Sequence, residues 1–277
     1  MVPEGTAVPS SDVLVTLSDA ERSSGRTSEP NMRKALDALK RFGFVQVDNA
    51  LSAEVVAGLR HDYERRHTTT TEAELKRRSL RVGEKRYMIT VEISGAFNDP
   101  TVYANPCVFP MVSEILGGEA VLDNLTVVSA LPGAAAQHIH IDHPPLFAEG
   151  LTQMVPCYAV TLVVPLVDPF LGAGATAAWL GSHRNAWTVP IEQRSLGDAF
   201  VPQPRLGSVY MMDFRLVHAG APNTSAVVRP IICMVYSRPW FTDCRNFSRQ
   251  ARLRMSAADL AGVPEEFRPV LARASGA

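Results

Sequence analysis

The sequence has little of several features that define other classes of protein. Its 277 residues carry 27 Lys and Arg against 28 Asp and Glu. The resulting net charge of -1 provides no general field to hold a nucleic-acid backbone or an anionic membrane. No apolar run approaches the roughly 20 residues that span a bilayer, and the N-terminal segment lacks the basic start and apolar stretch of a signal peptide. We therefore expect a soluble cytoplasmic protein with neither nucleic acid nor membrane as a partner.

Cysteine and two common catalytic motifs are also scarce or missing. The four cysteines form no C-x-x-C pair, which predicts reduced thiols and no disulfide framework; they are Cys107, Cys157, Cys233 and Cys244. The sequence has no G-x-S-x-G nucleophile elbow, which argues against a serine hydrolase. It also has no G-x-G-x-x-G placed after a strand, which argues against dinucleotide binding.

The composition predicts one globular domain behind a short tail. Hydrophobic residues make up 46% of the chain and charged residues 20%, a balance typical of folded proteins. Residues 1–29 are rich in Ser, Thr, Pro and Glu and predict a flexible N-terminal tail, with one short strand at Val13–Leu17. Residues 30–277 are expected to form a single domain.

Helices are predicted first along that domain. Apolar residues at three- and four-residue spacing predict a helix from Asn31 to Gly43. A strand over residues 44–51 should follow, then a helix capped by Ser52 and another over Pro106–Leu116.

Strands dominate the later part of the chain. From about residue 120 to 240, short β-branched runs alternate with Gly and Pro turns, and one helix is expected to follow over 256–274. Such spacing favours a mainly β protein with flanking helices and a jelly-roll core.

The densest chemistry lies in Gln137-His138-Ile139-His140-Ile141-Asp142-His143. Alternate side chains of a strand share a face, so we expect His138, His140 and Asp142 on one side and the isoleucines on the other. His140 and Asp142 would then form a chelating pair, and His218 is the best third ligand. Two histidines and one carboxylate leave positions open on the ion, as in non-haem Fe(II) oxygenases, although Zn(II) or Mn(II) would also bind.

A single arginine follows the third candidate ligand. Arg229 lies eleven residues after His218, where an apolar run begins. A buried arginine is costly unless it is paired, and a carboxylate ligand would pair it in a bidentate manner.

Together these motifs resemble the phytanoyl-CoA dioxygenase family of Fe(II)/2-oxoglutarate-dependent oxygenases. The resemblance covers roughly residues 33–245. It rests on the entry segment from Arg41 to Leu59, His140-Ile141-Asp142, Gly181-Ser182-His183-Arg184, and His218 followed by Arg229.

The resemblance implies a double-stranded β-helix of the cupin-like type. It implies that His140, Asp142 and His218 are the catalytic metal ligands and that Arg229 binds the far carboxylate of 2-oxoglutarate. Asp142 argues against halogenation, because the related halogenating enzymes have Gly or Ala at that place. The family often has a hydroxyl residue two positions after the distal histidine, where this chain has Gly220. The expected replacements are Ser225 and Thr161.

Other residues are candidates for binding roles. Gln137 is a candidate contact for the cosubstrate. Residues 54–86 hold charges of both signs, typical of a solvated helical surface; alternatively Lys85 or Arg86 meets an anionic cosubstrate or substrate. His138 is either structural or a substrate contact, and Phe147 and Trp240 are candidate apolar contacts for the substrate.

The expected activity is oxidation of a small-molecule metabolite by Fe(II), 2-oxoglutarate and O2, with release of succinate and CO2. Hydroxylation is the expected outcome, in the manner of natural-product tailoring enzymes. Desaturation, epimerisation and cyclisation by the same chemistry stay open as alternatives. So do a metal-binding jelly roll without oxygenase activity and an interaction protein that uses the basic 60–86 segment.

Overall fold

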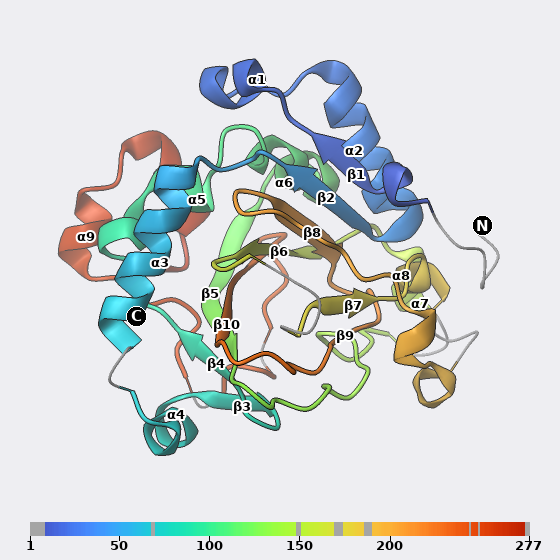
Figure 1. The fold of residues 1–277 in the computed structure, drawn as a ribbon. Helices are drawn as coiled ribbons and strands as arrows, with labels where there is room; N and C mark the ends of the chain where they lie inside the picture. The colour runs from blue at the N-terminus through green and yellow to red at the C-terminus, as the bar shows by residue number, and fades with distance from the viewer. Residues whose placement is uncertain are drawn as a thin grey trace.

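The computed structural model describes residues 9–67, 70–147, 151–168, 174–185, 190–243, 245–248 and 250–274. Its centre is one large, strongly curved sheet that faces a small two-stranded sheet (Figure 1). Helices cover the outside of the large sheet. This is the expected mainly β, jelly-roll architecture with flanking helices.

The large sheet has eight strands. Its strands, in spatial order, are β1 (Leu14–Thr16), β2 (Phe44–Asp48), β8 (Val209–Asp213), β6 (Ala159–Pro165), β10 (Arg229–Ser237), β5 (Val121–Ala130), β4 (Arg86–Thr90) and β3 (Leu80–Gly83). All neighbouring pairs are antiparallel except β1 and β2, which are parallel. The central strands are buried on both faces, which explains their nearly continuous apolar sequences.

The small sheet closes the other side of the jelly roll. It pairs β7 (Thr176–Ala178) with β9 (His218–Gly220) in antiparallel register. The predicted strand over residues 137–143 is reduced to a single bridge, in which His140 pairs with His218. The two isoleucines of this segment pack on an apolar layer, which consists of Trp179, Val217 and Ala219.

Helices cover the outer face of the large sheet, with α2 against β1 and β2 at the top of Figure 1. The helices of the described residues are α1 (Asp19–Ser24), α2 (Glu29–Phe42), α3 (Ala53–His67), α4 (Glu72–Arg78), α5 (Pro100–Tyr103), α6 (Phe109–Leu116), α7 (Leu151–Met154), α8 (Ser182–Asn185) and α9 (Ala257–Ala261). The 3-10 turns are Ser10–Asp12, Gly95–Asn98, Ile191–Gln193, Leu196–Asp198 and Glu265–Leu271. Helices α7 and α8 lie beside the small sheet (Figure 1). Helix α2 buries Ala35, Leu39 and Phe42, and Gly43 ends it with a left-handed φ of 70°.

Two expectations at the ends of the chain are wrong. Residues 9–29 are not a flexible tail, because β1 pairs with β2 and buries Val13, Val15 and Leu17 in the main core. The expected strand in this segment is confirmed; residues 1–8 lie outside the described residues. The single predicted C-terminal helix is divided into α9 and the 3-10 turn Glu265–Leu271, because Pro264 cannot continue the helix.

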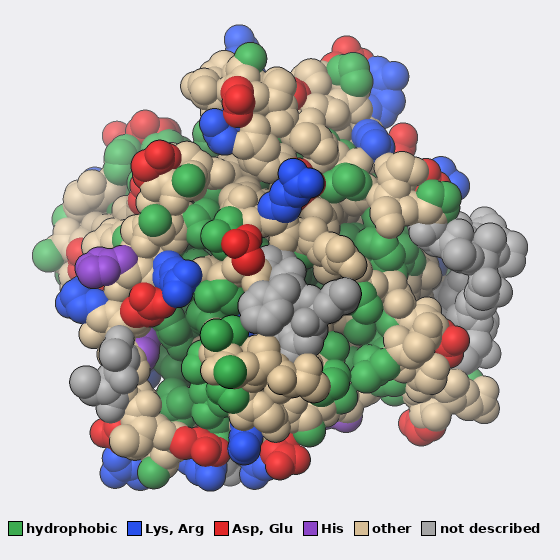
Figure 2. All heavy atoms as spheres, in the orientation of Figure 1, with side chains coloured by type: hydrophobic (Ala, Val, Ile, Leu, Met, Phe, Trp, Pro, Cys, Tyr) green, Lys and Arg blue, Asp and Glu red, His purple; other side chains and the backbone are tan. Residues whose placement is uncertain are grey.

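The surface agrees with the mixed charge of the sequence. Lys and Arg alternate with Asp and Glu along the lower rim in Figure 2, where α4 lies. No helix in the described part of the chain has the length and apolarity needed to cross a bilayer. Cys107, Cys157 and Cys233 are free thiols, whereas Cys244 is outside the described residues.

Candidate metal centre and its cavity

Three candidate metal ligands meet where the chain segment before α7 crosses β9. The backbones of His140 and His218 exchange two hydrogen bonds, with N···O distances of 3.0 and 2.9 Å. This bridge places the two imidazole centroids 4.4 Å apart. Asp142 follows two residues after His140, and one ligand atom from each of the three side chains lies within 4.8 Å of the others.

Backbone carbonyl groups orient both imidazoles. Nδ1 of His140 lies 2.8 Å from the carbonyl oxygen of His138, and Nδ1 of His218 lies 2.9 Å from that of Leu216. Each Nδ1 therefore carries the proton and donates it, which leaves the lone pair of Nε2 for a metal ion. His218 Nε2 lies 3.4 Å from Oδ1 of Asp142, a separation that suits two ligands of one ion.

Two further side chains hold Asp142 in place. Thr161 donates a 3.0 Å hydrogen bond from its hydroxyl to Oδ2 of Asp142. Asn246 donates from Nδ2 to the backbone carbonyl of Asp142 at 2.9 Å. Because Thr161 uses one carboxylate oxygen, the other, Oδ1, is left to face His218. Hydrogen-bonded partners of this kind fix the orientation of metal ligands.

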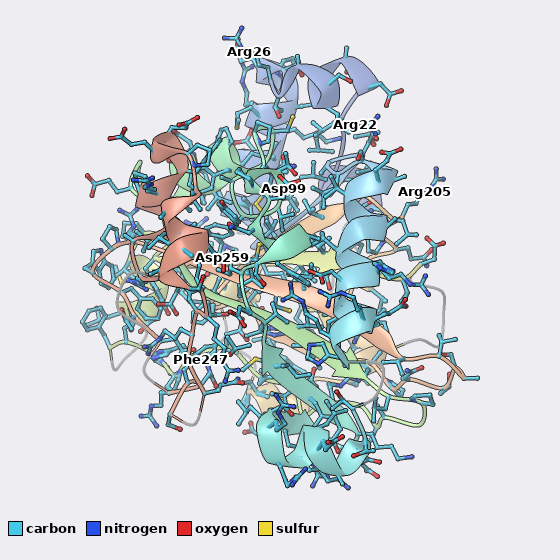
Figure 3. All side chains as sticks on the ribbon, turned by 90° about the vertical axis from the view of Figure 1, so that its left-hand side faces the viewer. Arg22, Arg26, Asp99, Arg205, Phe247 and Asp259 are labelled. Atoms are coloured by element: carbon cyan, nitrogen blue, oxygen red, sulfur yellow. The ribbon has the colours of Figure 1, made fainter. Side chains whose placement is uncertain are left out.

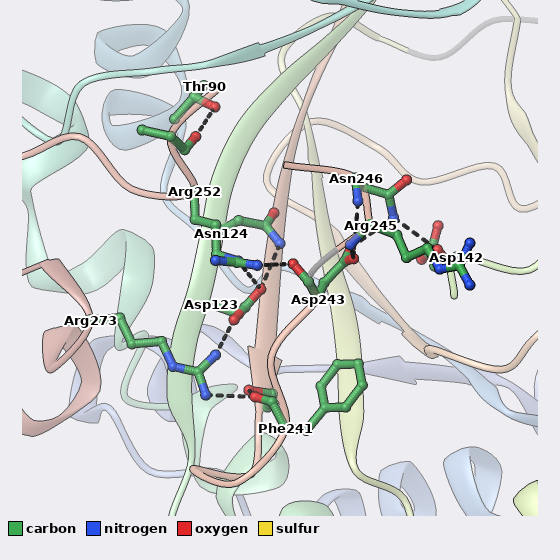
Figure 4. A network of polar contacts seen from close by, with 12 residues as sticks. Thr90, Asp123, Asn124, Asp142, Phe241, Asp243, Arg245, Asn246, Arg252 and Arg273 are labelled. Carbon is green, nitrogen blue, oxygen red and sulfur yellow. Dashed lines mark hydrogen bonds and ion pairs between the residues drawn. The ribbon is translucent and has the colours of Figure 1, made fainter. Parts of the chain in front are cut away.

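Asn246 belongs to a polar network that ties the segment after β10 to the sheet (Figure 4). Its Nδ2 also donates to Oδ2 of Asp243 at 2.7 Å, and Arg252 donates to the backbone carbonyl of Asp243. Arg252 and Arg273 both form ion pairs with the fully buried Asp123 on β5. The metal-facing segment is thus anchored to the middle of the large sheet.

The charges of the three ligands suit a divalent cation. Burial, and then the positive charge of His218, lower the pKa of His140 to about 4, so this imidazole is neutral at pH 7. Burial alone would raise the pKa of Asp142 and lower that of His218. Their mutual attraction outweighs burial, so the pKa of Asp142 is lowered and that of His218 is raised. A divalent ion would take the place of that attraction and hold the carboxylate and both neutral imidazoles.

The ligands line a cavity of about 360 Å³, within the size range of small-molecule sites. Alternate residues of the large sheet face it, including Arg229, Ile231, Cys233 and Val235 of β10. Arg229 is 3% exposed, and burial lowers its pKa below the ordinary arginine value. The structure therefore brings Arg229 into the same cavity as the three candidate ligands.

The candidate cosubstrate residues have different locations. Gln137 lines the cavity, but its amide is used in the structure: Nε2 donates to the carbonyl of Val82 and Oε1 accepts from the backbone of Gly220. Ser225 donates to Asn223 and is not among the described residues that line the cavity. Thr161 lines the cavity and donates to Asp142, as described above.

Lys85 lies in the turn between β3 and β4, with a φ of 50°, and its Nζ lies 3.5 Å from the carbonyl oxygen of Pro132. It is not among the described lining residues, whereas the next residue, Arg86, is.

Of the candidate substrate contacts, only His138 lines the cavity among the described residues. Its ring centroid lies 4.9 Å from that of His140. Phe147 is 51% exposed and Trp240 is 65% exposed, and neither is among the described lining residues. Trp240 packs against Tyr158 and Phe241.

Asn246 and Phe247, which follow β10, are among the lining residues that the sequence did not indicate. In Figure 3, Phe247 lies in the lower half of the molecule, whereas Arg22 and Arg26 of the N-terminal segment lie at the top. No local pattern marks Asn246 or Phe247, because only the return of the chain past the end of the sheet brings them to the cavity.

Comparison with known proteins places the chain in the family that its motifs resemble. The phytanoyl-CoA dioxygenase (PhyH) family profile matches residues 39–231, more than half of the chain. A curated relative, Dioxygenase af480 of Aspergillus fumigatus, is 26% identical over 256 residues, which cover 89% of this chain and 77% of the relative.

Solved structures share the fold. HygX from Streptomyces hygroscopicus, with nickel, 2-oxoglutarate and hygromycin B bound, aligns with a TM-score of 0.61 at 16% identity, over 81% of this chain and 97% of HygX. The epimerase SnoN, in complex with Fe3+, alpha ketoglutarate and nogalamycin RO, aligns with a TM-score of 0.60 at 17% identity, over 82% of this chain and 96% of SnoN.

The carbocyclase SnoK from nogalamycin biosynthesis aligns with a TM-score of 0.55 at 19% identity, over 76% of this chain and 84% of SnoK. The profile match, the fold and the His-Asp-His cluster agree with one another. The chain belongs to the phytanoyl-CoA dioxygenase family of Fe(II)/2-oxoglutarate-dependent oxygenases.

Proposed function

We propose that this protein hydroxylates a small-molecule metabolite, with Fe(II) and 2-oxoglutarate as cofactor and cosubstrate. The observation that carries the proposal is the shared cavity, which presents two imidazoles, one carboxylate and a buried arginine to the same space. The donor set fits Fe(II), because it would hold a divalent ion with nitrogen and oxygen ligands and no thiolate.

Each residue has a defined part in this proposal. His140, Asp142 and His218 would hold the iron, and Arg229 would bind the far carboxylate of 2-oxoglutarate through a charge-assisted pair. When bound, iron and 2-oxoglutarate supply the oxidising chemistry, with O2 consumed and succinate and CO2 released. Apolar side chains such as Met88, Val128 and Ile231, which belong to three neighbouring strands, exclude water from that space.

The size of the cavity and the ligands of the structural relatives both support a small-molecule metabolite as the substrate. About 360 Å³ admits a small organic molecule and is too little for a folded macromolecule. Two of the structural relatives are described with hygromycin B or a nogalamycin bound. We therefore propose a natural-product tailoring role, in which this protein oxidises one position of a preformed small molecule.

The test is an incubation with Fe(II), 2-oxoglutarate, O2 and a panel of natural-product scaffolds. Substrate-dependent succinate release and a product one oxygen atom heavier than the substrate are the expected results. The matched control is Asp142→Asn, which keeps the size of the side chain and removes the ligand charge. Succinate release that is equal in this variant would contradict the proposed site.

A second outcome has a specific observation in its favour. The structural relatives include an epimerase and a carbocyclase, so the same cavity type also supports reactions without hydroxylation. The product mass separates these outcomes: epimerisation leaves it unchanged, whereas desaturation or ring closure removes two hydrogens. The residual possibility, a metal-binding jelly roll, predicts metal uptake without succinate.

A further inference from the structure

A second buried arginine faces the cavity. Arg86, the first residue of β4, is 0% exposed and lines the cavity. Its Nη2 donates to the backbone carbonyls of Ala221 and Ala135 at 2.7 and 3.4 Å. Its Nε and Nη1 have no hydrogen-bond partner among the described residues. Buried donors are almost always paired, so these two donors indicate a ligand.

The strand register places Arg86 beside Arg229. Both residues pair with Ala130, Arg86 from one side of β5 and Arg229 from the other. Residues in one row of an antiparallel sheet share a face, and two strand spacings correspond to about 9–10 Å between their Cα atoms. The residue between them, Ala130, has a small side chain, and both arginines line the cavity. The two guanidinium groups therefore lie on the cavity face of the same row.

The buried charge of Arg86 favours an anion in the cavity. None of the described carboxylates forms an ion pair with Arg86, and the acidic lining residues Asp142 and Asp243 are already bound to other groups. Burial, followed by the positive charge of Arg229, lowers the pKa of Arg86 to about 10. The guanidinium remains charged at pH 7, so a bound carboxylate would offset both the burial and the repulsion.

Gly220 shows what Arg86 replaces. A Cβ at position 220 would lie 2.6 Å from Nη1 of Arg86 and 2.5 Å from Oε1 of Gln137. The guanidinium thus occupies the space that a side chain two residues after His218 would need. The family resemblance implies a hydroxyl residue at this position, where this chain has Gly220. Gln137 supports the arrangement, because its two hydrogen bonds to Val82 and Gly220 tie the β3–β4 hairpin to β9.

We propose that Arg86 binds the far carboxylate of 2-oxoglutarate together with Arg229, in place of the hydroxyl group that is missing at Gly220. This inference rests on the proposed function. It also separates Arg86 from Lys85: the turn directs Lys85 toward Pro132, whereas the first position of β4 directs Arg86 into the cavity. One carboxylate bridged by two guanidiniums gains charge-assisted hydrogen bonds from both.

The test measures binding and does not depend on turnover. The affinity for 2-oxoglutarate is determined by calorimetry on the full chain loaded with Mn(II), for the wild type, Arg86→Met and the control Lys85→Met. We expect Arg86→Met to weaken binding about 10- to 100-fold, since a hydrogen bond to a charged group is lost. Lys85→Met should stay within two-fold of the wild type.

A second ligand makes the test specific. 2-Oxobutyrate has the same metal-binding end as 2-oxoglutarate but no far carboxylate, so Arg86→Met should not weaken its binding. Equal losses for both ligands, or an Arg86→Met affinity for 2-oxoglutarate within two-fold of the wild type, would overturn the inference. Failure of the metal-loaded wild type to bind 2-oxoglutarate would instead overturn the proposed function.

Two other variants keep the inference testable if Arg86→Met does not fold. Arg86→Lys keeps the buried cation but loses the planar fork, and should weaken 2-oxoglutarate binding several-fold while leaving 2-oxobutyrate unaffected. Gly220→Ser should weaken binding, because its side chain collides with Arg86. The double variant Arg86→Met/Gly220→Ser should bind 2-oxoglutarate more tightly than Arg86→Met alone. If Arg86→Met is unfolded, the double variant should bind it more tightly than Gly220→Ser alone. A double variant without this gain would contradict the replacement of the hydroxyl group by Arg86.

Discussion

Arg215 and Arg86 are both buried, but their surroundings differ. Arg215, just after β8, forms two hydrogen bonds with the carboxylate of Asp213 at 2.8 and 2.7 Å. Its Nη1 also donates to the carbonyls of Thr152 and Val155. Burial by itself lowers the pKa of Arg215, but the bonds and the charge of Asp213 outweigh burial and raise it. For Arg86, burial and Arg229 act together and lower the pKa to about 10.

The difference separates structural charge from binding charge. Arg215 has a carboxylate of the chain itself, so its charge is balanced in the folded protein and serves to join the α7 region to the sheet. Arg86 has no such partner among the described residues, so an external anion must balance it. Two buried side chains of one chemical type thus have separable roles, and the following variants test that separation.

The largest effect should come from removing the metal site while both arginines remain. We expect His218→Ala to lose iron binding and to fall below about 1% of wild-type turnover, because loss of a ligand costs more than the 10- to 100-fold cost of its supporting partners. Iron content per chain is measured after gel filtration, with His61→Ala as the control. Unchanged iron stoichiometry in His218→Ala would remove it from the ligand set.

Breaking the structural pair should mainly affect stability. Arg215→Met leaves the buried carboxylate of Asp213 without its cation, and we expect the free energy of unfolding to fall by about 3–5 kcal/mol. Urea denaturation measures the change, and the affinity of the folded fraction for 2-oxoglutarate should remain that of the wild type. If Arg215→Met lost 2-oxoglutarate affinity but kept normal stability, the structural role of Arg215 would be contradicted.

The same pair makes stability depend on pH. Burial raises the pKa of Asp213, but the hydrogen bonds and charge of Arg215 outweigh burial and lower it below the usual value. Its contribution is therefore fully present above an unfolded pKa of about 3.9 and is lost as the pH falls below that value. As the pH is lowered from 6 to 3, the urea midpoint should fall more steeply for the wild type than for Asp213→Asn.

Arg229 on β10, which we propose binds the cosubstrate, should differ from Arg215: its removal should mainly lower the affinity for 2-oxoglutarate. Arg229→Ala should raise the 2-oxoglutarate concentration needed for half-maximal turnover at least roughly 30-fold, because truncating a buried charge pair costs about 2 kcal/mol or more. The exposed Arg205→Ala serves as the control (Figure 3). An unaltered requirement in Arg229→Ala would exclude this residue from the cosubstrate site.

The smallest effect should come from the partner of Asp142. Thr161→Val removes the hydrogen bond to Oδ2 and keeps the shape of the side chain, and we expect about 10-fold weaker metal binding. Thr126→Val, at another lining position, is the matched control and should leave metal affinity unchanged. Competition with a chelator measures both. Equal affinities in the two variants would show that Thr161 does not orient the carboxylate.

The sequence predicted the candidate metal ligands because two of them form a compact motif. His140 and Asp142 are two residues apart, and the spacing of His218 and Arg229 follows the family pattern. Gln137 and Thr161 were placed near the site, but their hydrogen bonds to Gly220 and Asp142 depend on which strands lie side by side. That arrangement cannot be obtained from local periodicity.

The sequence alone could not decide whether Lys85 or Arg86 faces the cavity. Both residues are basic and adjacent, and only the position of the β3–β4 turn decides which of them enters the cavity. The convergence of Arg86 and Arg229 further depends on their common pairing with Ala130, which joins residues far apart in the sequence. Strand existence was predictable from short apolar runs, but strand register was not.

The N-terminal segment has a consequence for shortened forms of the protein. Strand β1 is the outermost strand on its side of the large sheet, where it covers the free edge of β2. A chain that begins at residue 30 would leave the outer backbone groups of Gln46–Asp48 open to pairing with another molecule. We expect such a chain to self-associate even though its cavity residues are intact, so the opening residues protect solubility as well as the fold.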